Sequence, residues 1–334
     1  MIRWIAGGLA LLVLLALPAF VTRPHHRHVL IMILLYAMLA AAWNILAGYC
    51  GQISLGHAIF FGLGAYTSTT LVKQAALSPW IGMVAGATVA VVVSQAIGFP
   101  VFRLRGHYFA IATIALGEIV QTLFINWDWI GGARGVFIPI RRPDSLLHLQ
   151  FHESKQNYYY IALAMFALAL LLTRLLERSR AGYYFRAIRE DQEAAASLGI
   201  NVARTKQLAM GISAGLTALG GTFYAQYILF IDPESVLSLS LSILICLVAV
   251  LGGVGTLWGP LLGAAVLVPL SEGTRVLLGG GGKALDLLIY GGLIVLISVA
   301  QPGGLMALLR RARGNAHQLG LGAPSRPRLG HDKP

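Results

Sequence analysis

The chain has 334 residues, of which 57% are hydrophobic and only 11% are charged, and its mean hydropathy is +0.73. Soluble domains carry about 25% charged residues and could not bury this much apolar surface, so the composition excludes a soluble globular enzyme, a disordered chain and a fibrous protein. It indicates an all-α polytopic membrane protein. The net charge of +12 does not indicate a nucleic-acid partner, because the basic residues lie in loops between apolar runs.

Apolar runs long enough to cross a bilayer recur along the whole sequence, and we expect about ten transmembrane helices. The predicted spans are 4–22, 29–47, 53–72, 81–102, 109–127, 158–176, 207–229, 238–252, 257–278 and 285–300. The first run reads as a retained helix rather than a signal peptide, since no clean small-x-small cleavage site lies near residue 20. The sequence therefore predicts a transmembrane domain over 1–300, followed by a basic tail, 301–334, that is cytoplasmic and disordered.

The distribution of Lys and Arg predicts the orientation of these spans. With the N-terminus inside, the inside segments 1–3, 48–52, 103–108, 177–206, 252–256 and 301–334 hold 15 of them. The outside segments 23–28, 73–80, 128–157, 230–237 and 272–284 hold 9. Cytoplasmic loops are enriched in these residues, so both termini are expected in the cytoplasm.

A long polar segment, residues 177–206, separates two apolar runs. Its residues 183–198 have the periodicity of one amphipathic helix, and Gly199 follows as a left-handed stop. The expected apolar stripe comprises Tyr184, Ile188, Ala195 and Leu198. The charged face predicts the i,i+4 pairs Arg186 with Glu190 and Arg189 with Glu193. Such a helix lies on the lipid surface or docks a cytoplasmic partner, and its mixed charge and small Ala194, Ala195 and Ala196 favour docking.

A second informative segment, residues 48–70, is rich in glycine and holds Gln52, Ser54 and His57 at membrane depth. Small residues allow close packing of helices, whereas irregular polar backbone inside a membrane is tolerated only within protein or against a water-filled path. Both interpretations stay open. A similar Gly-rich stretch at 251–263 gives only weak evidence for an internal repeat.

Glu118 is the one carboxylate well inside a predicted span. A charged group in lipid is costly and usually faces the interior of a bundle. It could pair with Arg103 or Arg105, line a transport path, or couple transport to an ion. The candidate path residues are Asn44, Gln52, Ser54, His57 and Glu118.

The sequence contains no catalytic or metal-binding motif. The run GGGGKA at 279–284 resembles part of a phosphate-binding loop, but Leu277 stands where its first glycine belongs and Ala284 where Ser or Thr would bind magnesium. The histidines at 25, 26 and 28 lack partner ligands. We therefore expect no catalytic residue, cofactor or metal in this chain.

Four blocks of the sequence resemble one transport family. AAWNILAGYCGQISLGHAIFFGLGAYTS at 41–68 and RLRGHYFAIATIALGEI at 103–119 are similar to signatures of LivM-type permease subunits of branched-chain amino acid ABC importers. RAIREDQEAAASLGINVARTKQLAM at 186–210 resembles their cytoplasmic coupling loop, and AVLGGVGTLWGPLLGAAVL at 249–267 their late Gly-rich stretch. The blocks together are specific, because they span most of the chain in the family's order.

The resemblance implies a permease subunit that imports leucine, isoleucine and valine across the bacterial inner membrane, with the fold of ribose and vitamin B12 permeases. It implies a LivH-type permease partner, two cytoplasmic ATPases that bind ATP and magnesium, a periplasmic amino acid-binding protein and membrane lipid. Glu193-Ala194-Ala195 and Gly199 match the EAA-x-x-x-G core of importer coupling loops, although the downstream Ile-x-Leu-Pro run is absent. The residues expected to couple to the ATPase are Arg186, Arg189, Glu190, Glu193, Ala194, Ala195 and Gly199.

Two rival functions remain at this point. Related permeases carry urea or short amides, so the substrate class is not fixed by the resemblance. An ion-coupled secondary transporter would work without ATPases and would need Glu118 or another membrane acid.

Overall fold

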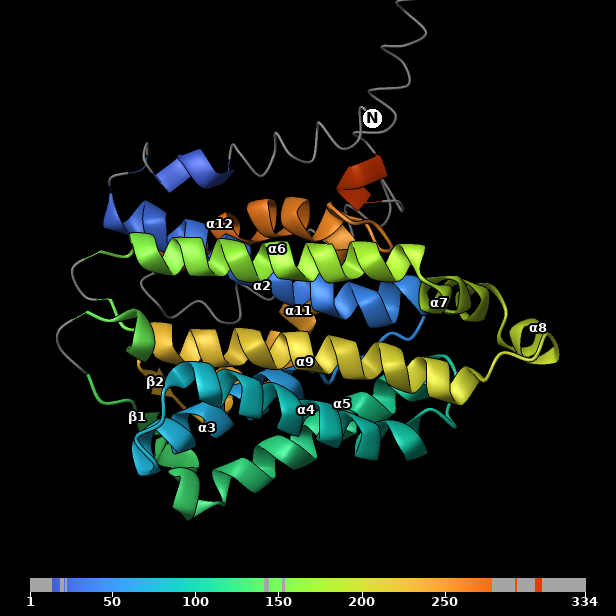
Figure 1. Cartoon of the computed structure of the whole chain (residues 1–334), viewed down its shortest axis with the longest axis horizontal. Coiled ribbons are helices and arrows are strands. Elements are labelled where there is room, and N and C mark those ends of the chain that lie inside the picture. The colour runs from blue at the N-terminus through green and yellow to red at the C-terminus, as the bar shows by residue number, and fades with distance from the viewer. Residues whose placement is uncertain are drawn as a thin grey trace, which may run out of the picture.

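The computed structural model describes residues 14–18, 21, 23–140, 144–151, 154–277, 292 and 304–307, and within them it is a helical bundle (Figure 1). The long helices are α2 (Pro24–Asn44), α3 (His57–Gln74), α4 (Pro79–Val101), α5 (His107–Ile125), α6 (Gln156–Arg178), α9 (Val202–Ile228), α11 (Leu239–Gly252) and α12 (Gly259–Leu277). Short elements are α7 (Arg180–Glu190), α8 (Gln192–Ser197), α10 (Pro233–Val236) and the antiparallel strands β1 (Val136–Phe137) and β2 (Phe230–Ile231).

Eight of the ten predicted spans correspond to helices of the structure, from α2 to α12. Six helical segments are both long and apolar enough to cross a membrane: 24–49, 79–101, 107–125, 156–178, 202–228 and 233–252. This supports a multi-pass membrane protein. The run 279–284 lies outside the described residues, as do most of the predicted spans 4–22 and 285–300 and of the tail 301–334.

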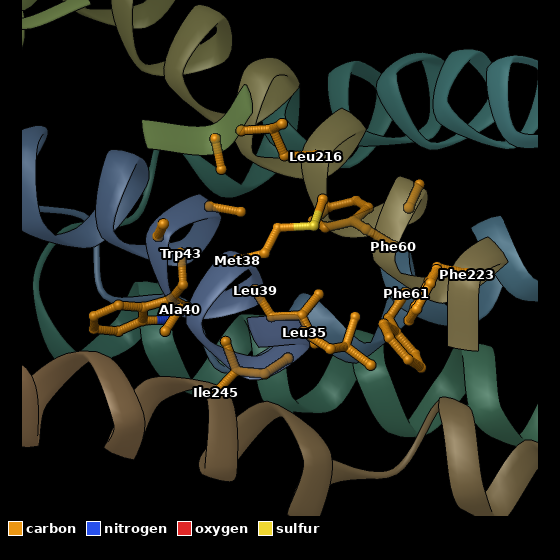
Figure 2. Packing of buried hydrophobic residues seen from close by; sticks show 14 of the residues in the cluster. Leu35, Met38, Leu39, Ala40, Trp43, Phe60, Phe61, Leu216, Phe223 and Ile245 are labelled. Carbon is orange, nitrogen blue, oxygen red and sulfur yellow. The ribbon is translucent and has the colours of Figure 1, made fainter. Parts of the chain in front are cut away.

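Helix α2 is the central helix of the bundle and packs against α6, α9, α11 and α12. From Ile31 onward it is mostly buried, and a π-helical turn, Ile45–Tyr49, continues it. Figure 2 shows its side chains among those of α3, α9 and α11, with Met38 pointing towards the ring of Phe60. The core is therefore formed by the early helices together with α9.

Glycines set the distance between α3 and α9. A methyl group at Gly221 of α9 would overlap the carbonyl of Phe61, and one at Gly64 of α3 would overlap that of Ala218. Small residues at such contacts let two helix backbones approach closely, as is common in membrane bundles. Thr222 uses this proximity to donate a hydrogen bond to the Gly64 carbonyl at 3.0 Å.

Contacts between the connections of the helices are found at two ends of the bundle. At the α7–α8 end, an Arg105–Glu193 ion pair joins the α4–α5 connection to α8, and Asn44 bonds Thr256 before α12. At the β1–β2 end, Trp80 donates to the Leu146 carbonyl at 2.7 Å. Figure 1 shows these ends at opposite sides of the long axis. Which of the two ends faces the cytoplasm stays a prediction.

Helix α3 begins inside the bundle rather than at its end. The predicted span 53–72 starts too early, because the chain is non-helical from Gly51 to Gly56 and α3 begins at His57. Ser213, which contacts His57, lies eleven residues into α9, so α3 starts roughly 16 Å along that helix. The physical reason is that Gly51 has a φ of +74°, which ends the preceding helix.

Candidate functional site

The polar segment between α6 and α9 forms two helices, not the single helix predicted over 183–198. Asp191 is extended, with φ −154° and ψ 118°, and its carboxylate accepts hydrogen bonds from the backbone N–H groups of Glu193 and Ala194. It is the N-cap of α8, a role that aspartate favours. These two bonds hold the pKa of Asp191 below its ordinary value. The Asp in the sequence REDQEAA is the signal that could have located this break.

The predicted ion pairs along this segment are wrong. Arg186 instead donates to the carbonyls of Glu177 and Gly182 and lies over the ring of Tyr183. The break at Asp191 takes Glu193 off the face of α7, and Glu193 pairs with Arg105 at 2.7 Å. Glu190 is exposed and has no ion pair among the residues that the structure describes.

The predicted apolar stripe is also only half right. Ile188 and Ala195 are buried as expected, but Tyr184 is 43% exposed and Leu198 is 82% exposed. Phe185 takes the buried position instead. Tyr183, Tyr184 and Leu198 form an exposed apolar set on α7 and at the end of α8. Large apolar side chains exposed on a polar segment are typical of a protein contact.

Gly199 ends α8 with a φ of +84°, which confirms the predicted left-handed stop. Its N–H donates to the Ala196 carbonyl at 2.9 Å. No heavy atom lies within 4 Å of the position a Cβ would take. The backbone conformation, and not a close neighbour, therefore explains glycine here.

Three segments meet where α2 ends. Asn44 donates from Nδ2 to the Thr256 carbonyl at 3.0 Å and accepts at Oδ1 from the Gly255 N–H at 2.8 Å. Arg189 of α7 donates to the Gly48 carbonyl at 2.6 Å. We call Asn44, Gly48, Arg189, Gly255 and Thr256 the α2 junction. It joins α7 to both Gly-rich stretches that the sequence singled out.

The polar residues predicted to line a path at 52–57 are buried, and their hydrogen bonds lie inside the chain. Gln52 donates to the Cys50 carbonyl at 3.4 Å, and Ser54 accepts from the Gly56 N–H at 3.3 Å. His57 is fully buried and contacts Ser213 Oγ at 2.8 Å. Exposure alternates along this extended segment, with Gly51 and Ile53 exposed and Gln52 and Ser54 buried.

Side chains from two other helices hold the same segment, and sequence reasoning missed both of them. Thr113 of α5 accepts from the Leu55 N–H at 3.0 Å. Ser242 of α11 accepts from the Ala58 N–H at 2.9 Å. Single Ser and Thr residues within apolar runs give no distinctive sequence signal, because their partners are more than 50 positions away.

Glu118 points out of the chain rather than into its bundle. It is exposed, and neither Arg103 nor Arg105 pairs with it, since Arg105 is bound to Glu193 roughly 20 Å along the helix. The exposed stripe of α5 carries Ala115, Glu118 and Thr122 beside the large apolar side chains of Ile111, Ile119 and Leu123. On α4 the exposed stripe carries Ile81, Val84, Val92 and Phe99, and that helix has no charged side chain. The Glu118 carboxylate is what sets the α5 stripe apart, since a charge that faces lipid is costly.

The described residues contain no group of three or more His, Cys, Asp or Glu side chains that could hold a metal ion. What they do contain is a bundle of membrane-length helices, a broken helix at mid-bundle, an outward-facing carboxylate and a polar helical segment at one end. These features define a multi-pass helical membrane protein.

The chain belongs to the family described as the branched-chain amino acid transport system permease component, whose model matches residues 27–298. The high-affinity branched-chain amino acid transport system permease protein LivM of Salmonella typhimurium is 31% identical over 84% of this chain and 69% of its own length. The LivH protein of the same organism is 26% identical over 70% of this chain and 79% of its own length. The autoinducer 2 import system permease protein LsrC of Klebsiella pneumoniae is 31% identical over 50% of this chain and 47% of its own length. No solved structure matches the chain significantly.

Proposed function

We propose that this chain is one permease subunit of an ATP-driven importer that carries leucine, isoleucine and valine across the bacterial inner membrane. Similarity to the LivM protein over most of the chain is the observation that carries the proposal. The full fold has about ten membrane spans, of the ribose and vitamin B12 importer type, and both termini lie in the cytoplasm. The excess of Lys and Arg at the α7–α8 end supports that orientation.

The partners follow from the same similarity. A LivH-type permease completes the membrane unit, two cytoplasmic ATPases bind ATP and magnesium, and a periplasmic protein delivers the amino acid. The chain itself binds no cofactor. Similarity to LivH as well as to LivM supports two related subunits built on one plan.

The ATPase docks on α7 and α8. Tyr183, Tyr184 and Leu198 are exposed there, and α7 and α8 project beyond the end of the bundle in Figure 1. Apolar side chains at the centre of a contact with a charged rim are usual for protein interfaces. Glu193, Ala194 and Gly199 lie in the same exposed segment.

The translocation path runs along the exposed stripe of α5, between this chain and its permease partner. A carboxylate at membrane depth is stable against water or a partner helix but not against lipid. Glu118 therefore lines the path directly, with Ile53 at its inner end. The buried Asn44, Gln52, Ser54 and His57 hold the wall behind it.

Transport then needs no chemistry in this chain. ATP binding closes the ATPase pair, α7 and α8 move with it, and the helices alternate between outward and inward openings. The driving force is the difference in free energy between the two states when ATP is bound. The side chains and backbone of this chain only guide the substrate.

The first test is to purify the tagged protein in mild detergent from cells that also express its neighbouring transport genes. Recovery of a second permease and two ATPases, with uptake of leucine into proteoliposomes only when ATP and the binding protein are present, supports the proposal. Competition by isoleucine and valine but not by urea fixes the substrate class. Purification of the chain alone with uptake that needs no ATP would instead support an ion-coupled transporter.

The path is tested separately with thiols. Glu118→Cys and Ala115→Cys should react with a charged, membrane-impermeant methanethiosulfonate, and excess leucine-loaded binding protein should change the rate. Val92→Cys on the aliphatic stripe of α4 is the matched control and should stay unreactive. The native Cys50 is fully buried but the native Cys246 is partly exposed, so all three variants are made with Cys246→Ser to keep the background low. Equal reactivity on both helices would contradict the assignment of α5.

A further inference from the structure

Arg189 does not extend away from the bundle as a docking residue would. Its guanidinium Nη1 donates to the Gly48 carbonyl at 2.6 Å, in the π-helical turn that ends α2. The N–H groups of Gly51 and Gln52 bond to Ala47 and Leu46, so they do not compete for that carbonyl. Carbonyls in the last turn of a helix lack intrahelical donors and carry the negative end of the helix dipole. Arg189 is therefore a charged C-terminal cap of α2, supplied by α7.

The contact between these segments is close along its whole length. A Cβ built at Gly51 would lie 3.1 Å from the Cα of Arg189. One built at Gly255 would lie 2.6 Å from its Nη1. The backbone and aliphatic stem of Arg189 thus lie against the segment that leads into α3, and its guanidinium lies beside the connection that leads into α12.

Asn44 extends this connection, because it holds Gly255 and Thr256 against α2 through both of its polar atoms. A second link grips the same turn: Tyr49 donates to Glu177 at 2.7 Å, and Glu177 is held by Arg174 at 2.7 Å. The π-helical turn is thereby fixed to the last turn of α6 at Glu177 and to the end of α7 at Arg189. A movement of α7 would pull on α2 through Arg189, and α2 is the most buried of the candidate membrane spans.

We infer that Arg189 is the positioning residue that transmits movement of α7 to α2 and α12, and that it acts within the permease and not on the ATPase. The inference rests on the proposed function, since it needs an ATPase that moves α7. It differs from the role expected for the neighbouring exposed residues, which is to hold the ATPase itself. Loss of Arg189 should leave ATP hydrolysis running while helix movement follows it poorly.

The test measures leucine transported per ATP hydrolysed by the whole importer in proteoliposomes. Arg189→Ala should lower that ratio by a factor of five or more, with the ATPases recovered in normal amount. Arg189→Lys should restore part of the ratio, since an ammonium donates to one carbonyl as a point charge. Arg204→Ala is the matched control: Arg204 is exposed at the same end and its side chain makes no hydrogen bond or ion pair with any described residue, so the ratio should not change.

Gly255→Ala gives a second test, because its methyl group would push Nη1 away from Gly48 while Arg189 itself is unchanged. Gly255 has a φ of +73°, so alanine also strains the backbone there, and Gly106→Ala, with a φ of +57° and no heavy atom within 4 Å of its Cβ position, is the control for that strain. Gly255→Ala should reproduce the uncoupling, and the double variant should be no worse than either single one. If Arg189→Ala does not fold, Arg189→Lys and Gly255→Ala test the inference without it. A normal ratio in Arg189→Ala, or in Arg189→Lys and Gly255→Ala, would overturn the inference, as would loss of the ATPases from purified Arg189→Ala. Lack of ATP-dependent uptake by the unaltered importer would instead refute the proposed function.

Discussion

His57 and Ser213 are both fully buried, and their Nε2 and Oγ atoms lie 2.8 Å apart where α3 begins against α9. Ser213 has one hydroxyl proton, which it donates to the Ala42 carbonyl at 2.6 Å. Ser213 must therefore accept from His57, so Nε2 carries the proton and His57 is the neutral tautomer with a bare Nδ1. Nδ1 has no partner among the described residues. The contact joins α2, α3 and α9 through one chain of hydrogen bonds.

This geometry predicts that His57 and Ser213 stabilise the bundle as a unit. Each of His57→Ala and Ser213→Ala should lower stability by about 1–3 kcal/mol, since each leaves a buried polar group without its partner. The double variant should lose clearly less than the sum of the two. Thermal unfolding in detergent measures this, and strict additivity would show that the contact does not couple the helices. Thr88→Ala on the exposed side of α4 is a suitable control, because its hydroxyl bonds only within its own turn.

The ion pair of Arg105 with Glu193 should contribute little to stability, and only one of its two residues should matter for ATP-driven uptake. Its side chains are 67% and 76% exposed, and exposed pairs contribute at most about 1 kcal/mol. Arg105→Ala should therefore change the melting temperature little and leave ATP-driven uptake intact. Glu193→Ala should reduce uptake and the recovery of ATPase, because the carboxylate also lies on the docking surface. Equal loss of uptake in both variants would mean that the ion pair itself is required.

Gly199 predicts a graded response to substitution. With φ at +84° and open space around the Cβ position, only backbone strain opposes a side chain, about 1–2 kcal/mol for an ordinary residue. Asn tolerates this conformation better than Ala, and Val tolerates it worst. ATP-driven uptake should therefore fall in the order Gly, Asn, Ala, Val, with insertion into the membrane unchanged. Equal uptake by all four would show that the turn after α8 is not part of coupling.

The sequence predicts the parts of this fold that depend on strong local signals. Apolar length locates α2, α4, α5, α6 and α9 to within a few residues, and the left-handed turn at Gly199 follows from its position after a helical pattern. The sequence does not predict which residues, far apart in the chain, contact one another. Arg189 and Gly48 are 141 positions apart, and nothing in either segment marks the guanidinium as an α2 cap.

The direction of Glu118 illustrates the same limit of local pattern. A single carboxylate in an apolar run shows that the helix is unusual, and intramembrane acids usually face the interior of their bundle. Which face of α5 is covered depends on how α3, α10 and α11 pack beside it, and those contacts are set by residues more than 30 positions away. The exposed stripe is therefore visible only in the folded chain.

The contact between α3 and α9 predicts a site where a single methyl group prevents normal folding. Gly221→Ala would place its Cβ against the carbonyl of Phe61 and the backbone nitrogen of Ala65, and neither atom belongs to a flexible side chain. The two helices must separate, which disrupts the close packing along both. Overpacking of a core usually lowers the free energy of unfolding by about 1–3 kcal/mol, and the loss here should exceed that range. Gly273→Ala in α12 is the matched control, because no heavy atom lies within 4 Å of its Cβ position and alanine favours helix. Fluorescence-detected size exclusion should show a large loss of monodisperse protein for Gly221→Ala and none for Gly273→Ala. Similar profiles for the two variants would mean that α3 and α9 do not pack as closely as the structure places them.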